Sequence, residues 1–438
     1  MKKFLYGCFA ICLLSGCGLF KKAPLDVDGQ RISVIREDKN IQPDYAAGQV
    51  KIKLPVTHIN DTWAHNGGTS MHLNGHLKAT GDLDEIWSTS FGKGTSKRNH
   101  LLASPVAANN IVYTLDAEGI VKAFRLDNGK KIWKKRLKHA NKNLKDNSLS
   151  GGGLAVHEDV VYATSGLGKV FALNAESGDT VWELDLKSPI RIAPTVNDDL
   201  VIVQTLDNGI FAIKTASGNI LWKDKIETES TTMIGGAAPA YSPENDLVVA
   251  AFSNGQIQAY KASTGSLLWS EWIVSAASTE SISDITSIKA NPVIDGTAVY
   301  VVGYNAPLAA IDIRTGVKLW QKDIASSSQP WVAGQILFVL TNDGDIAALD
   351  KTTGNVIWSA IVPSTHDADK SGVFATGPLL ANDSLLVATS EGKLYSVSPY
   401  NGRILGIADI EKDVETAPVL VNETLLITTS DAELTAYK

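Results

Sequence analysis

The sequence predicts an all-β protein: an eight-bladed β-propeller with four antiparallel strands in each blade. Three observations support this fold class. A small residue, a turn glycine and a tryptophan recur along the chain with constant internal spacing, and successive copies lie about 45 residues apart. Each copy contains short apolar runs rich in β-branched and aromatic residues. Turns that contain glycine separate these runs, as in β-hairpins.

The amino terminus is predicted to be a lipoprotein signal peptide. Lys2 and Lys3 precede an apolar run, residues 4–14, which is shorter than the roughly 20 residues of a bilayer-spanning helix. The run ends in Leu-Ser-Gly-Cys, which resembles the bacterial lipobox. That resemblance implies that residues 1–16 are removed by cleavage before Cys17. It also implies that lipid, including palmitate, is attached to Cys17.

Cleavage and lipidation leave the mature chain without a free thiol, because Cys8 and Cys12 are removed. A disulfide, a cysteine-ligated zinc site and a thiol nucleophile are therefore not expected. The net charge changes from −7 to −9 with the loss of two lysines, and an acidic chain without a basic run argues against nucleic acid as a partner. Gly18 stands where aspartate retains many bacterial lipoproteins in the inner membrane, so the resemblance implies an outer-membrane location.

Residues 17–60 are predicted to be a lipidated amino terminus followed by a flexible tether. They lack a sustained helical or strand period and carry polar clusters, apart from one candidate strand at residues 31–35. The propeller is expected to occupy residues 61–438.

The start of the propeller contains three histidines, His65, His72 and His76. Their spacing allows a zinc site, but no convincing carboxylate or cysteine ligand lies nearby. A Gly- and Asn-rich loop that packs Trp63 under the propeller is the preferred interpretation, and no metal site is predicted.

The repeat has a steric explanation. Each turn glycine follows a small residue by six positions and precedes a tryptophan by four, whereas the intervals between glycines range from 38 to 51 residues. We expect each indole to pack on the turn glycine of a neighbouring blade and to donate its N–H to a buried carbonyl. The turn glycines are Gly129, Gly178, Gly218, Gly265, Gly316, Gly354 and Gly402, and the small residues are Ala123, Ala172, Ala212, Ala259, Ala310, Ala348 and Ser396. The blade-docking tryptophans are Trp87, Trp133, Trp182, Trp222, Trp269, Trp320 and Trp358.

The last two copies depart from this pattern. The seventh has Gly406 in place of tryptophan, which predicts a weaker junction. The eighth supplies three strands and stops at Lys438. An amino-terminal strand within residues 83–91, which includes Trp87, is expected to complete the last blade and close the ring.

These repeats resemble those of quinoprotein dehydrogenases, which form eight-bladed propellers that use pyrroloquinoline quinone (PQQ). Together with the lipobox and the length, they resemble the BamB family of outer-membrane assembly lipoproteins. The segments GQRISVI and WAHNGG are similar to its alphaproteobacterial branch, and the likeness covers nearly the whole mature chain from Trp63.

The BamB resemblance implies a non-catalytic scaffold of the β-barrel assembly (BAM) complex. Such a scaffold binds the periplasmic POTRA domains of BamA, works beside other BAM lipoproteins and helps unfolded outer-membrane proteins reach the insertion machinery. The lipid anchor would hold it at the periplasmic face of the outer membrane.

Two other functions stay open at this point. A quinoprotein-type dehydrogenase would need an adjacent cysteine pair and clustered acidic ligands, which this sequence lacks, and Asp207 and Asp343 fit turn positions better than catalytic ones. No Ser-His-Asp arrangement is visible either, so no catalytic residue and no cofactor are expected. The second alternative is a periplasmic propeller that binds a ligand in its channel.

Segments between blades should emerge on one face, where binding residues commonly lie on a rigid frame. The longest are residues 134–153 and 270–291. In the BamB family, one partner-binding loop carries apolar residues followed by arginine, which maps onto Leu186, Ile190 and Arg191.

A second family loop contributes aspartates, but this chain has Ser287 and Lys289 at those positions, with Asp284 nearby. Trp272 is a further candidate, because strand alternation directs it away from the face of Trp269. It would be either an exposed anchor for a partner or a side chain packed under its own loop.

Overall fold

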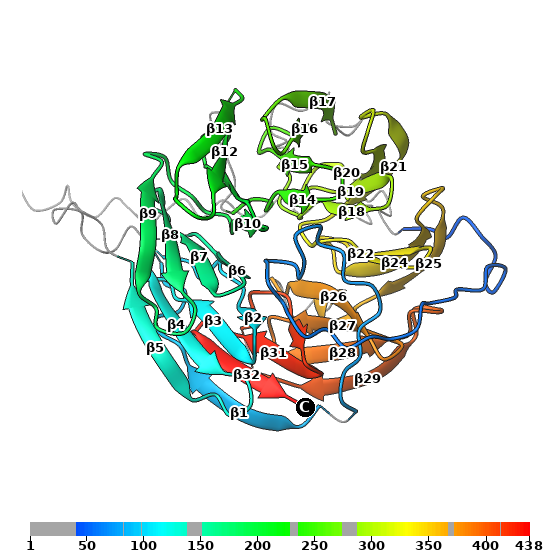
Figure 1. Ribbon diagram of the computed structural model, residues 1–438. Helices are drawn as coiled ribbons and strands as arrows, with labels where there is room; N and C mark the ends of the chain where they lie inside the picture. The colour runs from blue at the N-terminus through cyan, green and yellow to red at the C-terminus, as the bar shows by residue number, and fades with distance from the viewer. Residues whose placement is uncertain are drawn as a thin grey trace, which may run out of the picture. The chain divides into compact units, whose positions relative to one another are not determined.

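The computed structural model describes residues 41–81, 83–97, 99–137, 151–227, 235–273, 287–366, 372–411 and 413–438. All of them belong to one compact unit that begins at Ile41. The strands form eight four-stranded antiparallel sheets, and these are the blades of a propeller (Figure 1). The predicted fold class is therefore confirmed.

The first seven blades each use four consecutive strands, ordered from the axis to the rim. Blades 1 to 4 are β2 (Val106–Ala108), β3 (Ile111–Leu115), β4 (Ile120–Arg125) and β5 (Lys131–Arg136); β6 (Leu154–His157), β7 (Val160–Thr164), β8 (Lys169–Asn174) and β9 (Thr180–Asp185); β10 (Thr195–Val196), β11 (Leu200–Gln204), β12 (Gly209–Lys214) and β13 (Ile220–Lys225); β14 (Ala240–Ser242), β15 (Leu247–Ala251), β16 (Gln256–Lys261) and β17 (Leu267–Trp272). Blades 5 to 7 are β18 (Val293–Asp295), β19 (Ala298–Val301), β20 (Pro307–Asp312) and β21 (Lys318–Ala325); β22 (Trp331–Ala333), β23 (Ile336–Leu340), β24 (Asp345–Asp350) and β25 (Val356–Ile361); β26 (Ala375–Ala381), β27 (Ser384–Thr389), β28 (Lys393–Val397) and β29 (Ile404–Asp409). A short 3-10 helix, Pro363–His366, follows β25.

Blade 8 joins the two ends of the propeller sequence. It contains β30 (Val419–Val421), β31 (Thr424–Thr428), β32 (Glu433–Tyr437) and, as its outer strand, β1 (Glu85–Ser90). β1 pairs antiparallel with β32 and places Trp87 opposite Ala436. The carboxyl-terminal strand is thereby covered, and the ring is closed as the truncated eighth repeat predicted.

The burial of the residues in a strand depends on how far the strand lies from the rim. All five residues of β23 are buried, because the sheets of neighbouring blades cover both of its faces. The outer strand β5 alternates instead, with a buried Trp133 between exposed residues. The core therefore lies between adjacent sheets, and the outer strands face solvent with one side.

Within a blade, the small residue of the repeat makes room for two aromatic rings from the strands on either side of it. Tyr113 on β3 lies opposite Ala123 on β4, which lies opposite Trp133 on β5. The two rings meet over the alanine with their centroids 5.9 Å apart. A larger side chain at Ala123 would force them apart, which gives the small residue a role inside its own blade as well as at the junction.

Between blades, the indoles act as predicted by the spacing of the repeat. Each lies on the turn glycine of the next blade and donates its N–H to the carbonyl three residues before that glycine, with N···O distances of 2.6–3.0 Å. The indole, glycine and carbonyl residues are Trp87, Gly129 and Leu126; Trp133, Gly178 and Ala175; Trp182, Gly218 and Thr215; Trp222, Gly265 and Ala262; Trp269, Gly316 and Ile313; Trp320, Gly354 and Lys351; Trp358, Gly402 and Pro399. Trp87 makes the contact from blade 8 to blade 1.

The junction from blade 7 to blade 8 differs from the other seven. Gly406 occupies the tryptophan position opposite Ser396, and no atom lies within 4 Å of where its Cβ would be. All six residues of β29 are exposed. The outer part of this junction thus has no indole contact.

Residues 41–60, which the sequence analysis assigned to the tether, lie against the propeller in part. The backbone N–H of Asp44 donates to Val356 on β25 at 2.8 Å, and the carboxylate of Asp44 pairs with Lys322 at 2.8 Å. Ser359 donates its hydroxyl to the carbonyl of Ile41. These contacts explain why the compact unit begins at residue 41 and not at residue 61.

Candidate axial site

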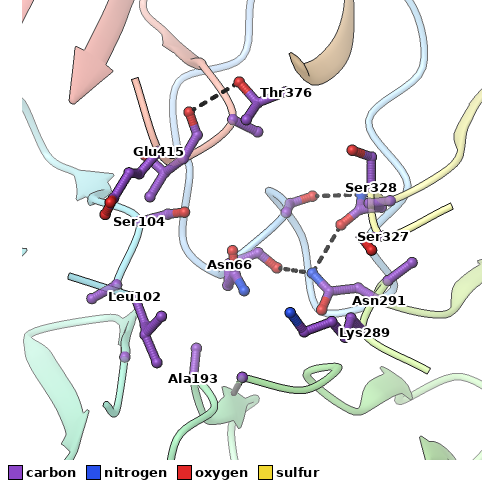
Figure 2. Close-up of a pocket in the computed structure, with 18 of the residues that line it drawn as sticks. Asn66, Leu102, Ser104, Ala193, Lys289, Asn291, Ser327, Ser328, Thr376 and Glu415 are labelled. Carbon is purple, nitrogen blue, oxygen red and sulfur yellow. Dashed lines mark hydrogen bonds between the residues drawn. The ribbon is translucent and has the colours of Figure 1, made fainter. Parts of the chain in front are cut away.

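One cavity in the described structure lies on the propeller axis, where all eight blades contribute to its wall. It has a volume of about 300 Å³ and is lined by residues just before the inner strand of every blade except blade 7, where the lining residues lie within β26. We call these eight stretches the approach segments. They contribute mostly small residues, including Gly152, Gly153, Gly235 and Gly236, which leave the axis open. Figure 2 shows polar groups from several approach segments around this space.

One end of the axis is covered by residues 58–80, which we call the axial segment. The segment makes a full circuit of the ring, starting and ending at blade 8, and Figure 1 shows it near the centre of the blades. Its hydrogen bonds join, in chain order, Asn60 to Leu420 and Asn422, Trp63 to Ala107, Ala64 to Val156, His65 to Val196, Ser70 to Tyr241, Met71 to Ile294, Gly75 to Trp331, Leu77 to Leu380, and Thr80 to Glu423. It therefore contacts every blade, and Trp63, Asn66 and Gly67 form part of the cavity wall.

Three of the four histidines of the axial segment, His65, His72 and His76, bond through their rings to backbone groups. His65 Nε2 lies 2.8 Å from the carbonyl of Val196, and His72 donates from Nδ1 to the carbonyl of Pro292 at 2.7 Å. Burial lowers the pKa of His65 and His72 to about 4, so both rings are neutral near pH 7. His76 bonds to the carbonyl of Pro55 and accepts from a backbone N–H at Asp383.

This arrangement favours the loop interpretation of the histidines over the zinc interpretation. Across the described ranges, no three or more His, Cys, Asp or Glu side chains lie close enough together to hold a metal ion. Within the same residues, the structure has no helix of the length and apolar character needed to cross a bilayer.

A network of amides fixes one wall of the cavity. Asn291 donates from Nδ2 to the carbonyl of Asn66 and to Gln329 Oε1, at 3.1 and 3.0 Å (Figure 2). Gln329 in turn donates to the carbonyls of His72 and Gly67. These bonds connect the axial segment to the approach segments of blades 5 and 6.

Three charged side chains line the cavity: Arg191, Lys289 and Glu415. The cations belong to the approach segments of blades 3 and 5, and the carboxylate belongs to that of blade 8. Glu415 accepts a hydrogen bond from the hydroxyl of Thr95 at 2.6 Å. The wall therefore carries more positive than negative charge.

The residues aligned with the partner-binding loop of the BamB family occupy different environments. Leu186 and Ile190 are buried in the core between blades 2 and 3, so the structure gives them a packing role and not an exposed one. Arg191, the next residue, faces the cavity. Ser287 is buried and Lys289 lines the cavity.

The other predicted positions lie at the rim or outside the described residues. Trp272 is 47% exposed at the end of β17, as an anchor for a partner requires. Asp284, Cys17 and most of the two longest segments between blades lie outside the described residues.

The two aspartates considered as catalysts occupy turns, as expected. Burial alone would raise the pKa of Asp207, but hydrogen bonds from Lys225, Ser188 and Thr205 outweigh it and lower the pKa to about 2. Asp343 is exposed in the turn before β24. Neither lines the axial cavity.

Comparison with known proteins defines the family. The family model described as outer membrane protein assembly factor BamB matches residues 117–360 and 342–438, which together span most of the propeller. This chain belongs to the BamB family.

Members of the BamB family in other bacteria share moderate sequence identity with this chain. The outer membrane protein assembly factor BamB of Yersinia pestis is 29% identical over 75% of this chain and 81% of its own length. That of Escherichia coli K12 is 28% identical over 73% and 79%, respectively.

Solved structures agree with the fold. BamB from Moraxella catarrhalis superposes with a TM-score of 0.67 at 20% identity, covering 81% of this chain and 99% of its own. The quinohemoprotein alcohol dehydrogenase of Comamonas testosteroni reaches 0.64 at 14% identity, covering 86% of this chain and 80% of its own, which is a likeness of fold alone.

The sequence analysis missed the axial site as a unit. It singled out Arg191 and Lys289 only as positions aligned with a rim contact. The Gly- and Asn-rich composition of residues 66–75 was the available signal, because an irregular segment with many backbone polar groups needs partners around it.

Proposed function

We propose that this chain is a non-catalytic scaffold of the outer-membrane protein assembly machinery. Membership of the BamB family carries the proposal, because the relatives from Yersinia pestis and Escherichia coli are named as outer membrane protein assembly factors. The rigid ring supports it, since blades tied by buried indoles hold rim segments in fixed positions.

The proposed partners are the POTRA domains of BamA, together with other BAM lipoproteins and segments of unfolded outer-membrane proteins. Trp272 is the best placed contact, because it is an exposed aromatic side chain at the end of β17. An exposed tryptophan can supply a large share of binding energy. Arg191 and Asp284 complete the candidate contacts.

We also propose that residues 1–16 are removed and that lipid on Cys17 anchors the chain to the periplasmic face of the outer membrane. The tether then covers residues 17–40, since the compact unit begins at Ile41.

The test is recovery of the full-length lipidated chain from detergent-solubilised outer membranes, with the co-purified proteins identified by mass spectrometry. We expect a barrel protein with POTRA domains, and we expect its purified POTRA domains to bind this chain in a titration. Absence of that protein from the eluate together with no binding in the titration would contradict the proposal.

A matched pair of variants tests the rim contact. Trp272→Ala should weaken POTRA binding by at least about tenfold, the effect of losing a hot-spot side chain, while leaving the melting temperature unchanged. Leu405→Ala, an exposed apolar residue on β29, serves as control and should change neither value. Unchanged affinity with a lowered melting temperature would instead mean that Trp272 packs under its own loop.

A further inference from the structure

Two cationic side chains, one from blade 3 and one from blade 5, line the cavity wall. Arg191 precedes β10 of blade 3, and Lys289 precedes β18 of blade 5. Gly235 and Gly236 of blade 4 lie between them: a Cβ on Gly235 would stand 3.7 Å from Lys289 Cε, and one on Gly236 would stand 2.6 Å from the side chain of Ile192. Gly235 therefore leaves space beside the Lys289 side chain, whereas Gly236 lets Ile192 pack closely on the backbone of blade 4.

Neither cation has an acidic partner in the part of the chain that the structure describes. Arg191 Nε is buried without a hydrogen-bond acceptor among those residues. Burial lowers the pKa of Lys289, which indicates that its ammonium group is partly desolvated without a compensating carboxylate. Both residues are half-buried, and a partly desolvated cation without a partner is unfavourable, so a bound anion would reduce that cost.

The carboxylate in the wall does not neutralise this pair. Glu415 lies in the approach segment of blade 8, and its Oε2 accepts from Thr95. Figure 2 shows Glu415 and Lys289 on different sides of the cavity. The excess positive charge is therefore concentrated on the side of blades 3 to 5.

We propose that the axial cavity binds a small oxyanion, a carboxylate or a phosphate, between Arg191 and Lys289. The guanidinium presents a planar set of donors that matches an oxyanion, and the ammonium adds a compact charge. The cavity volume of about 300 Å³ suits a small molecule. The axial segment covers one end of the axis, so the bound molecule is held inside the propeller and not passed through it.

The experiment is isothermal titration calorimetry of the full-length chain with succinate and, separately, with inorganic phosphate. We expect saturable one-to-one binding of at least one of them. Arg191→Gln and Lys289→Gln should each weaken it by about tenfold or more, the usual effect of losing a charge-assisted hydrogen bond. Arg403→Gln, which removes an exposed cation from a turn of blade 7, should leave the affinity within twofold.

Two charge-retaining variants make the test independent of stability. Arg191→Lys and Lys289→Arg should keep more affinity than the glutamine variants, and circular dichroism should show the same melting temperature for all five variants. Binding of succinate alone or phosphate alone identifies the preferred class of oxyanion. No binding of either anion to the wild-type chain, or binding that neither glutamine variant weakens, would overturn the proposal. POTRA binding is tested separately with Trp272→Ala, because Trp272 lies at the end of β17 and does not line the cavity.

Discussion

Two tryptophans three residues apart on β17 have opposite environments. Trp269 is buried on Gly316 and donates to the carbonyl of Ile313 at 2.7 Å, whereas Trp272 is exposed. Trp269→Ala should lower the free energy of unfolding by about 3–5 kcal/mol, because it empties a packed junction and leaves a carbonyl unpaired. Trp272→Ala, the control, should cost less than about 1 kcal/mol. Equal losses in urea denaturation would contradict the assignment of the two side chains.

The turn glycines provide a second test of the same contact. Gly129 has a φ of +66°, and a Cβ there would lie 2.6 Å from Trp87 Cε3. Gly296 has a φ of +59° with no atom within 4 Å of its Cβ position. Gly129→Ala should therefore lower the free energy of unfolding by about 1–3 kcal/mol more than Gly296→Ala. Both variants place alanine in a left-handed conformation, but only Gly129→Ala also displaces an indole. Urea denaturation of the two variants measures the difference.

The buried histidines predict how stability depends on pH. His65 and His72 have pKa values of about 4 in the folded chain and an ordinary value near 6.5 when unfolded. The unfolded chain binds more protons between these values, so the stability that the neutral rings contribute is present above about pH 6.5 and is lost as the pH falls towards 4. Urea unfolding at pH 7, 6, 5 and 4 should show this decline.

Variants assign that decline to the axial segment. The double variant His65→Gln, His72→Gln should reduce the slope of stability against pH in this range, although it lowers stability at pH 7. His58→Gln, at an exposed position of the same segment, should leave the slope unchanged. An unaltered slope in the double variant would show that other groups control the acid response.

At the scale of elements, β29 is the outer strand with the weakest support. All of its residues are exposed, and Gly406 replaces the indole that fixes the equivalent strand of every other blade. In the neighbouring blade, β25 has three buried residues and Trp358 donates to the carbonyl of Pro399. Local opening costs least where few apolar contacts must be broken.

We therefore expect faster amide exchange in β29 than in β25. Hydrogen–deuterium exchange with mass spectrometry can compare peptides that cover residues 404–409 and 356–361, which occupy the same place in adjacent blades. Exchange should be at least about tenfold faster in the first, a difference of about 1.4 kcal/mol in opening free energy. Equal protection would mean that another contact replaces the indole.

The strands and blades were predictable because the residues that define them lie close together in the sequence and recur in successive copies. The spacing from Ala348 through Gly354 to Trp358 fixes strand pairing and blade contact together, and six of the seven copies have it. The missing strand of blade 8 was predictable because an unpaired β32 would expose an edge.

The axial site was not predictable in the same way. Arg191 and Lys289 are about one hundred positions apart, and only the circular order of the blades places them on one cavity. The axial segment follows no period, since each of its hydrogen bonds meets a different blade. Sequence similarity to a rim loop also suggested exposure for Ile190, whereas its apolar side chain is buried next to the exposed end of the same loop.

At the scale of the whole molecule, the ring is closed twice. β1 completes blade 8 and carries Trp87 to blade 1, and the axial segment then connects all eight blades near the axis. Both closures come from residues 58–90, near the start of the compact unit. The chain that leads to the proposed lipid anchor is therefore tied to every blade.

This arrangement separates anchoring from folding, which gives a prediction for the two cysteines nearest the proposed cleavage site. Cys17→Ser should remove the protein from the outer-membrane fraction, because the chain then lacks the acyl groups that would anchor it there. The melting temperature of the propeller should stay the same, since the compact unit begins at Ile41. Cys12→Ser, inside the signal peptide, should keep the wild-type location. Separation of inner and outer membranes followed by immunoblotting measures both, and a Cys17→Ser protein that stays in the outer-membrane fraction would require an anchor other than lipid.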